Sequence, residues 1–247
     1  MTFFQQGRNQ PPSDISVCTR DEDFHAALES NIGPLRWKGL SCPAANPATA
    51  TMKAEFEELI ESYIRDKVGI DSIFLGSSLT SGLRDEIQRL DREGEMSYAG
   101  VSNTRQLEKQ DYRGDKIHWL GKNSGNSSED EFLDRIDQFV DHLNRSCYTG
   151  INAYEFHYAL YETGTSYKKH RDQFNNDNNR KYSMVSYLNE EWKDSDGGQL
   201  LIYQDGQPQA ITPNSGKAVF FESAEMEHEV TVATRPRMSV TGWLKRM

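Results

Sequence analysis

The sequence predicts an α+β fold, in which helices come first and an antiparallel β-sandwich or barrel follows. Before residue 150, apolar residues recur at helical spacing. After residue 150, short β-branched and aromatic runs alternate with turn residues, which is typical of antiparallel strands. The 247-residue chain is 36% hydrophobic, so it can bury one sizeable core without a disulfide or a structural metal.

The first 51 residues are expected to form an irregular extension. They are rich in Pro, Ala, Asn and Thr and show little apolar periodicity. The folded domain is therefore expected over residues 52–247, with the β-sandwich mainly in 150–247 and N-terminal helices supporting it.

Three helices are expected before the β-rich part. The first begins near Lys53, the second ends at Gly94, and the third begins at a cap formed by Ser127 or Ser128. Their apolar faces contain Phe56, Leu59, Ile60, Tyr63 and Ile64 in the first, Leu79, Leu83, Ile87 and Leu90 in the second, and Phe132, Ile136, Phe139, Leu143 and Cys147 in the third.

Strands are expected on both sides of Gly150. Two lie between the helices, at 71–77 and 114–121. The later ones are expected over 152–162, 181–189, 198–204, 209–213, 217–223, 228–234 and 237–244. Polar residues 97–111 are expected to form a long loop, of the kind that often closes over a functional site.

Charge and cysteine usage limit the classes of partner and compartment. The net charge of −10 argues against nucleic acid as the main partner, because an acidic chain repels a phosphate backbone. Cys18, Cys42 and Cys147 are widely spaced and odd in number, which indicates reduced thiols. No apolar run is long enough to span a membrane, and the first residues lack the pattern of a secretory signal. A cytoplasmic location is therefore expected.

The triplet His170-Arg171-Asp172 has two chemical interpretations. The same letters occur in the catalytic loop of protein kinases, but that loop requires an Asn where this chain has Asp177. The chain also lacks a glycine-rich loop and a DFG motif, so the kinase interpretation is rejected. On an extended strand, residues i and i+2 face the same side, so that His170 and Asp172 can bind one metal ion together. Fe(II) in non-haem oxygenases requires a second histidine.

His228 is the candidate for that second histidine, because it opens an apolar strand directly after a turn. The remaining histidines are expected to lie away from the metal site. His25 lies in the irregular extension, His142 on the solvated side of a helix, and His118 and His157 on outward faces of strands. Spacing alone leaves two alternatives open for His228, a metal ligand or an outward-facing side chain.

Arg237 is a second candidate site residue. Its neighbours Met238, Val240 and Trp243 indicate a core strand, where a lone arginine requires an anionic partner. Such an arginine can grip a carboxylate through two hydrogen bonds. Arg235 competes for this role, but Pro236 places it in a turn.

Taken together, these motifs resemble those of the 2-oxoglutarate- and Fe(II)-dependent dioxygenases. The closest resemblance is to the prolyl 4-hydroxylase branch, which includes oxygen-sensing hydroxylases and their bacterial relatives. The resembling stretches are YRGDKIHWL, YETGTSYKKHRD, VSYLNEEWKDSDGGQLLIY and RMSVTGW, within residues 70–247. The resemblance implies a double-stranded β-helix, or jelly roll, as the core of the α+β fold.

The resemblance also implies a role for each matching residue. His170, Asp172 and His228 look like the iron ligands. Arg237 looks like the residue that binds the distal carboxylate of 2-oxoglutarate, with the Tyr187 hydroxyl beside it. The other implied site residues are Tyr161 near the opposite end of the cosubstrate, Trp243 near the iron, and Arg180, Asp115 and Tyr167 around the substrate, with Arg180 and Asp115 as a pair at the rim. For both Tyr161 and Tyr187, a core tyrosine with a bonded hydroxyl stays the alternative.

The implied activity is hydroxylation of a prolyl residue at C4 in a protein substrate. It would consume O2 and 2-oxoglutarate, release succinate and CO2, and use ascorbate as the reductant that keeps iron as Fe(II). One alternative is a hydroxylase of a free amino acid or another small molecule. A second alternative, from a different class, is a non-catalytic binding module of the same fold.

Overall fold

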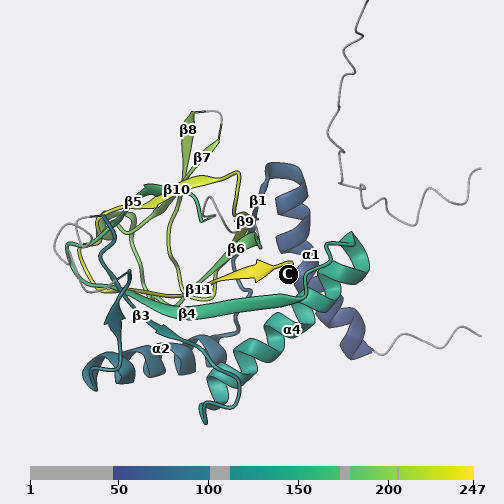
Figure 1. Cartoon of the computed structure of the whole chain (residues 1–247), viewed down its shortest axis with the longest axis horizontal. Helices are drawn as coiled ribbons and strands as arrows, with labels where there is room; N and C mark the ends of the chain where they lie inside the picture. The colour runs from purple at the N-terminus through teal and green to yellow at the C-terminus, as the bar shows by residue number, and fades with distance from the viewer. Residues whose placement is uncertain (1–46, 101–111, 173–178, 205) are drawn as a thin grey trace, which may run out of the picture.

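The computed structural model describes residues 47–100, 112–172, 179–204 and 206–247, with side chains from Phe56 onward. Within these ranges the strands form two antiparallel sheets, one of seven strands and one of four. The helices lie against the outer face of the larger sheet, on the side away from the smaller one (Figure 1). The predicted α+β fold with a jelly-roll core is confirmed.

The larger sheet has the order β1, β9, β6, β11, β4, β3, β2. These strands are β1 (Val68–Asp71), β9 (Ala218–Glu222), β6 (Arg180–Tyr187), β11 (Arg237–Lys245), β4 (Ala153–Tyr161), β3 (Asp115–Trp119) and β2 (Ser97–Tyr98). The smaller sheet contains β5 (Tyr167–His170), β10 (Glu227–Val230), β7 (Leu200–Gln204) and β8 (Gln207–Ile211), in that order. From β4 to β11 the chain passes repeatedly between the two sheets, as in a double-stranded β-helix.

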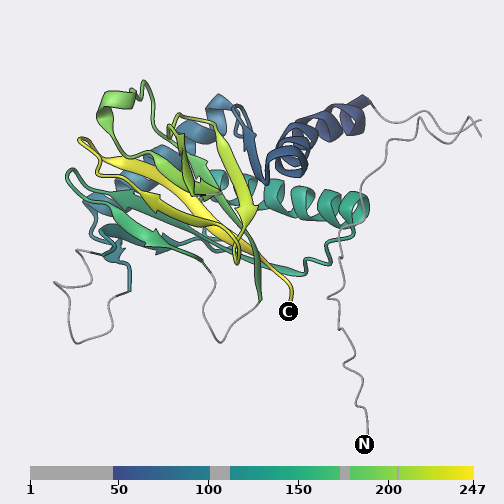
Figure 2. The ribbon, with the colours of Figure 1, turned by 90° about the horizontal axis from the view of Figure 1, so that it is seen from above.

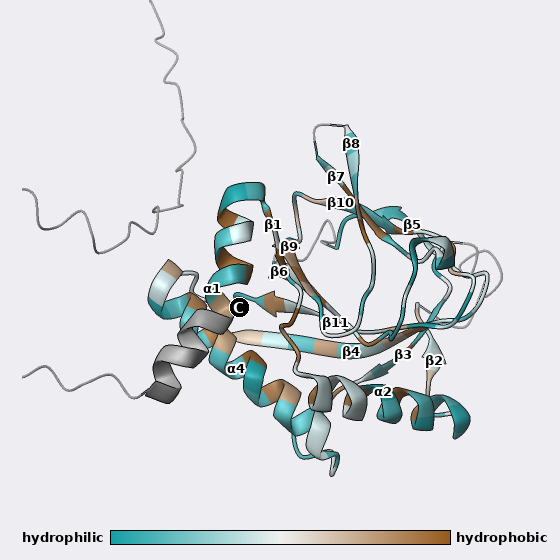
Figure 3. Ribbon diagram, turned by 180° about the vertical axis from the view of Figure 1, so that it is seen from behind, coloured by the Kyte–Doolittle hydropathy of each residue, from teal (hydrophilic) through white to brown (hydrophobic). Residues whose placement is uncertain are grey.

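Each strand of the larger sheet has one face toward the helices and one toward the smaller sheet. On β4, for example, Phe156, Tyr158 and Leu160 join the core under the helices, whereas Ala159 and Tyr161 join the core between the sheets. This alternation follows from the two-residue period of a strand. In Figure 3, strands β9 and β6 contain apolar stretches, which are coloured brown.

The helices are α1 (Pro47–Asp66), α2 (Ser77–Arg92) and α4 (Ser127–Cys147). Figure 2 shows α1 and α4 side by side at one end of the sheets. Phe56 on α1 packs against Phe139 on α4, with ring centroids 5.3 Å apart. The predicted apolar faces are largely confirmed, although Ile64 is 49% exposed. None of the described helices combines the length and apolarity needed to cross a membrane.

Several predicted boundaries were wrong. The strand expected at 71–77 is β1, which lies earlier, and residues 72–76 are irregular. The cap of α4 is Asn126, whose side chain accepts the backbone N–H groups of Ser128 and Glu129, rather than either serine. The strand expected over 228–234 ends at Val230.

The two segments expected to be irregular are only partly described. Helix α1 begins at Pro47, five residues before the boundary expected at residue 52, and residues 1–46 lie outside the described ranges. In the expected loop 97–111, Ser97 and Tyr98 pair with β3 as β2. Residues 101–111 lie outside the described part of the chain.

Candidate metal and cosubstrate site

His170, Asp172 and His228 converge between the two sheets. Their possible ligand atoms all lie within 4.8 Å of one another. Asp172 Oδ1 is 3.4 Å from His170 Nε2, and Asp172 Oδ2 is 3.6 Å from His228 Nε2. His170 and His228 are direct neighbours across strands β5 and β10. Strand β5 ends at His170, yet the Asp172 side chain still reaches the same side as the sequence predicts.

Backbone carbonyls fix the orientation of both imidazoles. Nδ1 of His170 lies 2.7 Å from the Lys168 carbonyl oxygen, and Nδ1 of His228 lies 3.0 Å from that of Met226. Because a carbonyl can only accept, each Nδ1 carries a hydrogen, and Nε2 is the atom of each ring that can bind a metal at the centre. Burial lowers the pKa of His228, against the influence of Asp172, which favours the neutral form that binds a metal.

The Asp172 carboxylate is held in its ionised form. Burial alone would raise its pKa, but the two neighbouring imidazoles and a hydrogen bond from Ser183 hold the pKa well below its usual range. Ser183 Oγ donates to Asp172 Oδ2 over 2.7 Å, and Ser223 Oγ lies 2.9 Å from Ser183 Oγ. Both serines are fully buried. Sequence reasoning missed them, because each is an ordinary serine in a strand or just after one.

Aromatic rings pack against the imidazoles. The Tyr167 ring stacks on the His170 ring with a centroid distance of 3.5 Å, and the Phe221 ring lies 4.9 Å from that of His228. Burial raises the pKa of Tyr167 to about 12, so its hydroxyl stays protonated near neutral pH. These contacts limit rotation of the two rings around the metal position.

Arg237 lies deep between the sheets and is only 1% exposed. Its Nε donates to the Gly198 carbonyl over 2.8 Å, and its guanidinium carbon lies 5.0 Å from the Tyr161 ring and 5.1 Å from the Tyr187 ring. Gly198 has a φ of +65°, and a Cβ there would lie 3.1 Å from Arg237 Cδ, so this glycine makes room for the arginine.

Within the described ranges, no carboxylate forms an ion pair with Arg237. A buried cation without an anionic partner is unfavourable by several kcal/mol. Arg237 therefore suits a ligand that brings its own carboxylate. The competing Arg235 has a side chain that is 44% exposed and lies near Asp196, as its predicted turn position implies.

The two tyrosines beside Arg237 are both buried. Burial raises the pKa of Tyr187 to about 12, although the charge of Arg237 opposes part of that rise. Apart from its interaction with the Arg237 guanidinium, the Tyr187 hydroxyl has no hydrogen-bond partner among the described residues. Burial also raises the pKa of Tyr161, which lines the same pocket as Arg237 and the three candidate ligands.

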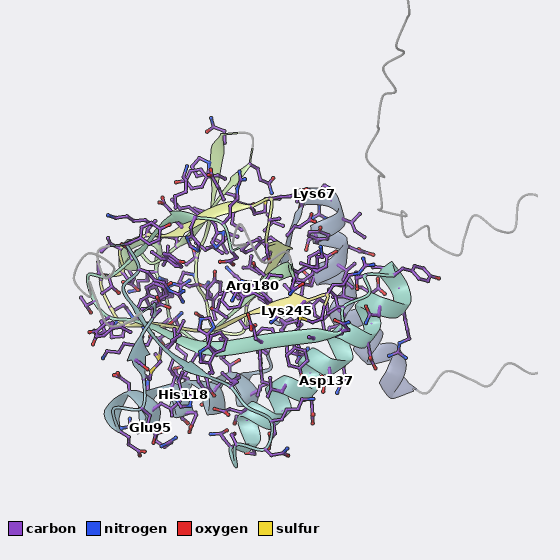
Figure 4. The ribbon with its side chains drawn as sticks, viewed as in Figure 1. Lys67, Glu95, His118, Asp137, Arg180 and Lys245 are labelled. Carbon is purple, nitrogen blue, oxygen red and sulfur yellow. The ribbon has the colours of Figure 1, made fainter. Side chains whose placement is uncertain are left out.

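The pairing expected between Arg180 and Asp115 was wrong. Asp115 is fully buried and accepts two hydrogen bonds from Arg113, at 2.7 and 2.9 Å, rather than lying at the rim. Arg180 instead binds Glu155 at 2.8 Å and donates to the Asp172 carbonyl at 3.2 Å. Arg180, the first residue of β6, and Lys245, the last of β11, both contact Glu155 and lie close together (Figure 4).

Trp243, which the resemblance places near the iron, lies in the pocket. It lines the same pocket as the candidate metal ligands. The guanidinium of Arg180 lies 3.5 Å from the centre of its ring, close enough for a cation–π contact. Trp243 therefore adds an aromatic surface to the pocket, and the ion pair of Arg180 with Glu155 lies against that ring.

Two histidines do not occupy the positions expected for them. His157 was expected to face outward, but it is 1% exposed and lines the pocket, because it shares the inner face of β4 with Tyr161. His142 was expected on a solvated face, but it is half-buried, and its ring packs 5.8 Å from that of Phe56. Arg171 is exposed, as predicted.

This arrangement suits Fe(II) with 2-oxoglutarate. Two neutral imidazoles and one ionised carboxylate form the ligand set that non-haem Fe(II) takes on one face. Arg237 supplies an unpaired buried positive charge for a dicarboxylate. The three candidate ligands and Arg237 line one pocket, together with Tyr161 and Trp243.

Comparisons with known proteins agree with this geometry. Residues 156–245 match the 2OG-Fe(II) oxygenase superfamily. A prolyl-4-hydroxylase from Pseudomonas putida is 34% identical, with a TM-score of 0.70, over 78% of this chain and 99% of that one. A prolyl hydroxylase from Trichoplax adhaerens, solved with a peptide fragment of a hypoxia-inducible factor, has a TM-score of 0.72 over 81% of this chain and 92% of that one. Because the two sequences are only 24% identical, this similarity supports the fold but not the function.

A shorter match links the chain to a third protein. Prolyl 3-hydroxylase OGFOD1 of Xenopus laevis is 36% identical over 75 residues. The matched stretch covers 26% of this chain but only 15% of that relative.

Proposed function

The chain belongs to the 2OG-Fe(II) oxygenase superfamily and is a 2-oxoglutarate-dependent dioxygenase, and from this premise we propose that it hydroxylates a prolyl residue of a protein at C4. The observation that carries this proposal is the similarity to the prolyl-4-hydroxylase of P. putida, which extends over nearly all of that protein. Hydroxylation at C3 is the second candidate, because the short match to the Xenopus protein is to a prolyl 3-hydroxylase.

In this proposal, His170 and His228 hold Fe(II) through their Nε2 atoms, and Asp172 holds it through its carboxylate. Iron and 2-oxoglutarate supply the oxidising chemistry when bound, with consumption of O2 and release of succinate and CO2. The contribution of the protein is to place the reactants and to limit the access of water. Ascorbate is the expected reductant for iron that has been oxidised to Fe(III).

Arg237 is the proposed anchor for the distal carboxylate of 2-oxoglutarate. Its Nε is occupied by the Gly198 carbonyl, so the terminal nitrogens of the guanidinium are the donors left to bind a carboxylate. The Tyr187 hydroxyl, whose neighbour among the described residues is the Arg237 guanidinium, is the proposed second donor to the same group. Tyr161 packs against the other side of Arg237 and fills the wall of the cosubstrate pocket.

The polypeptide substrate is proposed to bind on the side of Trp243, Arg180 and Tyr167. Aromatic rings at this end suit a proline ring, which is apolar and rigid. Asp115 acts indirectly in this proposal. It holds Arg113, whose guanidinium carbon lies 4.8 Å from the Tyr167 ring centre.

Mass spectrometry of the host proteome tests the proposal. Cells with the wild-type chain are compared with cells that carry His228→Ala. We expect a peptide in which one proline gains the mass of one oxygen atom only in the wild type. Acid hydrolysis and comparison with hydroxyproline standards then separate C4 from C3. Succinate release that is stimulated by free amino acids but by no peptide would favour the small-molecule alternative instead.

The cytoplasmic location and the absence of a nucleic-acid partner stay predictions. Fractionation of host cells tests the first. A binding assay with DNA and RNA oligonucleotides tests the second.

A further inference from the structure

His157 is a buried imidazole in the pocket of the candidate metal ligands. It is 1% exposed, and neither Nδ1 nor Nε2 has a partner among the described residues. Burial lowers its pKa to about 4, so that the ring is neutral at physiological pH and has one donor and one acceptor. A buried polar group left unpaired is unfavourable by about 1–3 kcal/mol, which makes an unpaired histidine in a ligand pocket a candidate ligand contact.

The strand register places His157 away from the cosubstrate anchor. Tyr161 pairs with Arg237 across β4 and β11, whereas His157 pairs with Thr241. Four residues of strand separate the two positions, which corresponds to about 13 Å. The carbon chain of 2-oxoglutarate spans at most about 6 Å, since each of its four bonds is about 1.5 Å long. His157 therefore lies at the end of the site opposite Arg237.

The neighbours of His157 mark that end as the substrate side. Its ring lies 5.4 Å from the ring of Trp243 and 4.9 Å from that of Trp119. Trp119 is 50% exposed and also lies 6.4 Å from Trp243, so this cluster of three rings extends from the pocket to the surface. Arg180 covers Trp243 from the other direction and donates to the carbonyl of Asp172.

We propose that His157 is a substrate-binding residue, whose ring N–H donates to a backbone carbonyl of the polypeptide beside the target proline. This inference rests on the proposed prolyl hydroxylation. A proline lacks a backbone N–H, so the chain around it has an excess of acceptors, and a donor is what the site must supply. The Trp119 and Trp243 rings, whose centroids are 6.4 Å apart, offer the proline apolar surface, and the His157 ring packs beside both of them.

Two substitutions at this position separate hydrogen bonding from packing. His157→Leu removes both nitrogens at similar volume, whereas His157→Gln keeps a donor and an acceptor. The probe is a library of blocked pentapeptides with proline at the centre. The library member that the wild-type chain hydroxylates best is then used for kinetics. The 2-oxoglutarate affinity of each Fe(II)-loaded variant is measured separately by anaerobic titration.

For His157→Leu we expect the peptide KM to rise about fivefold, which corresponds to one lost hydrogen bond of about 1 kcal/mol. His157→Gln should stay within about twofold of the wild type. The 2-oxoglutarate affinity should be unchanged in both variants. His157→Leu should also unfold at a higher temperature in the absence of substrate, because an unpaired buried polar group has been removed, and this shows that the variant folds.

Three results would overturn the inference. An unchanged peptide KM in His157→Leu would make His157 a packing residue. A loss of 2-oxoglutarate affinity in that variant would assign His157 to the cosubstrate. A wild-type chain that hydroxylates no library member, while still binding 2-oxoglutarate, would refute the proposed prolyl substrate and this inference with it.

Discussion

The Ser183 hydroxyl donates a hydrogen bond of 2.7 Å to Oδ2 of Asp172. An ionised carboxylate can only accept, so Ser183 uses its single hydrogen on Asp172. The contact of 2.9 Å between Ser183 and Ser223 must then have Ser223 as the donor. The result is a buried, one-directional chain of hydroxyls that ends on the candidate iron ligand, favours its charge and fixes its plane.

Removal of the Ser183 hydroxyl should weaken metal binding. Loss of a hydrogen bond to a ligating group typically lowers metal affinity 10–100-fold, so we expect about a tenfold higher Kd for Mn(II) in Ser183→Ala. Equilibrium titration with Mn(II) measures this without turnover. Ser186→Ala is the matched control, because Ser186 is a buried serine on the same strand whose Oγ makes no hydrogen bond to any described residue. Equal Mn(II) affinity in both variants would show that the hydroxyl chain does not support the ligand.

Replacement of Arg237 should affect the cosubstrate more than the metal. Arg237→Lys keeps the positive charge but loses the planar pair of donors, so we expect at least a tenfold loss of 2-oxoglutarate affinity with little change in Mn(II) affinity. Anaerobic calorimetry of 2-oxoglutarate binding to the Fe(II)-loaded protein measures the effect. Arg235→Lys, at an exposed arginine on the preceding turn, should behave as the wild type. Similar losses in both variants would remove Arg237 from its proposed role.

The buried His157 should make stability depend on pH. Its pKa is about 4 in the folded chain, compared with 6.5 for an ordinary histidine. Below pH 6.5 the unfolded chain takes up a proton that the folded chain does not, so the free energy of unfolding falls by about 1.4 kcal/mol per pH unit until about pH 4. Above pH 6.5 this group contributes no pH dependence.

Urea unfolding at pH 8 and pH 5 measures that contribution. Between these values the wild-type chain should lose roughly 2 kcal/mol more stability than His157→Leu. Equal losses in the two proteins would mean that His157 takes up its proton as readily in the folded chain as in the unfolded one.

Arg171 should tolerate substitution, although it lies between two candidate ligands. Its side chain is exposed, while His170 and Asp172 face the metal position. Arg171→Ala should therefore keep near-normal succinate production, whereas His170→Ala should abolish it. If Arg171→Ala folds normally but loses activity, Arg171 has a role in the reaction that its position does not reveal.

The sequence predicts the order of helices and strands well, but not where buried irregular segments lie. The run at 71–77 has the composition of a strand, yet Phe74 packs against both Phe56 and Phe139 under the helices. Burial of an apolar run can come from side-chain packing without any strand pairing. Local composition therefore does not distinguish these two outcomes.

The residues of the candidate site are also only partly predictable from the sequence. Motif resemblance identifies His170, Asp172, His228 and Arg237, and the structure places all four around one pocket. The inward position of His157 was available from the sequence, because it lies four residues before Tyr161 on the same strand and so shares its face. By contrast, the pairing of Asp115 with Arg113 and the contact of Ser223 with Ser183 depend on packing between strands, which the sequence does not report.

Anaerobic addition of 2-oxoglutarate to the Fe(II)-loaded protein tests the central claim most directly. If the three ligands and Arg237 form the site, a visible absorption band should appear and saturate with 2-oxoglutarate. The band should be absent from His228→Ala and unchanged in a control at His118, a half-buried histidine that lies outside the candidate metal group. A folded wild-type protein that binds Fe(II) but gives no band, or a band that survives in His228→Ala, would contradict the account.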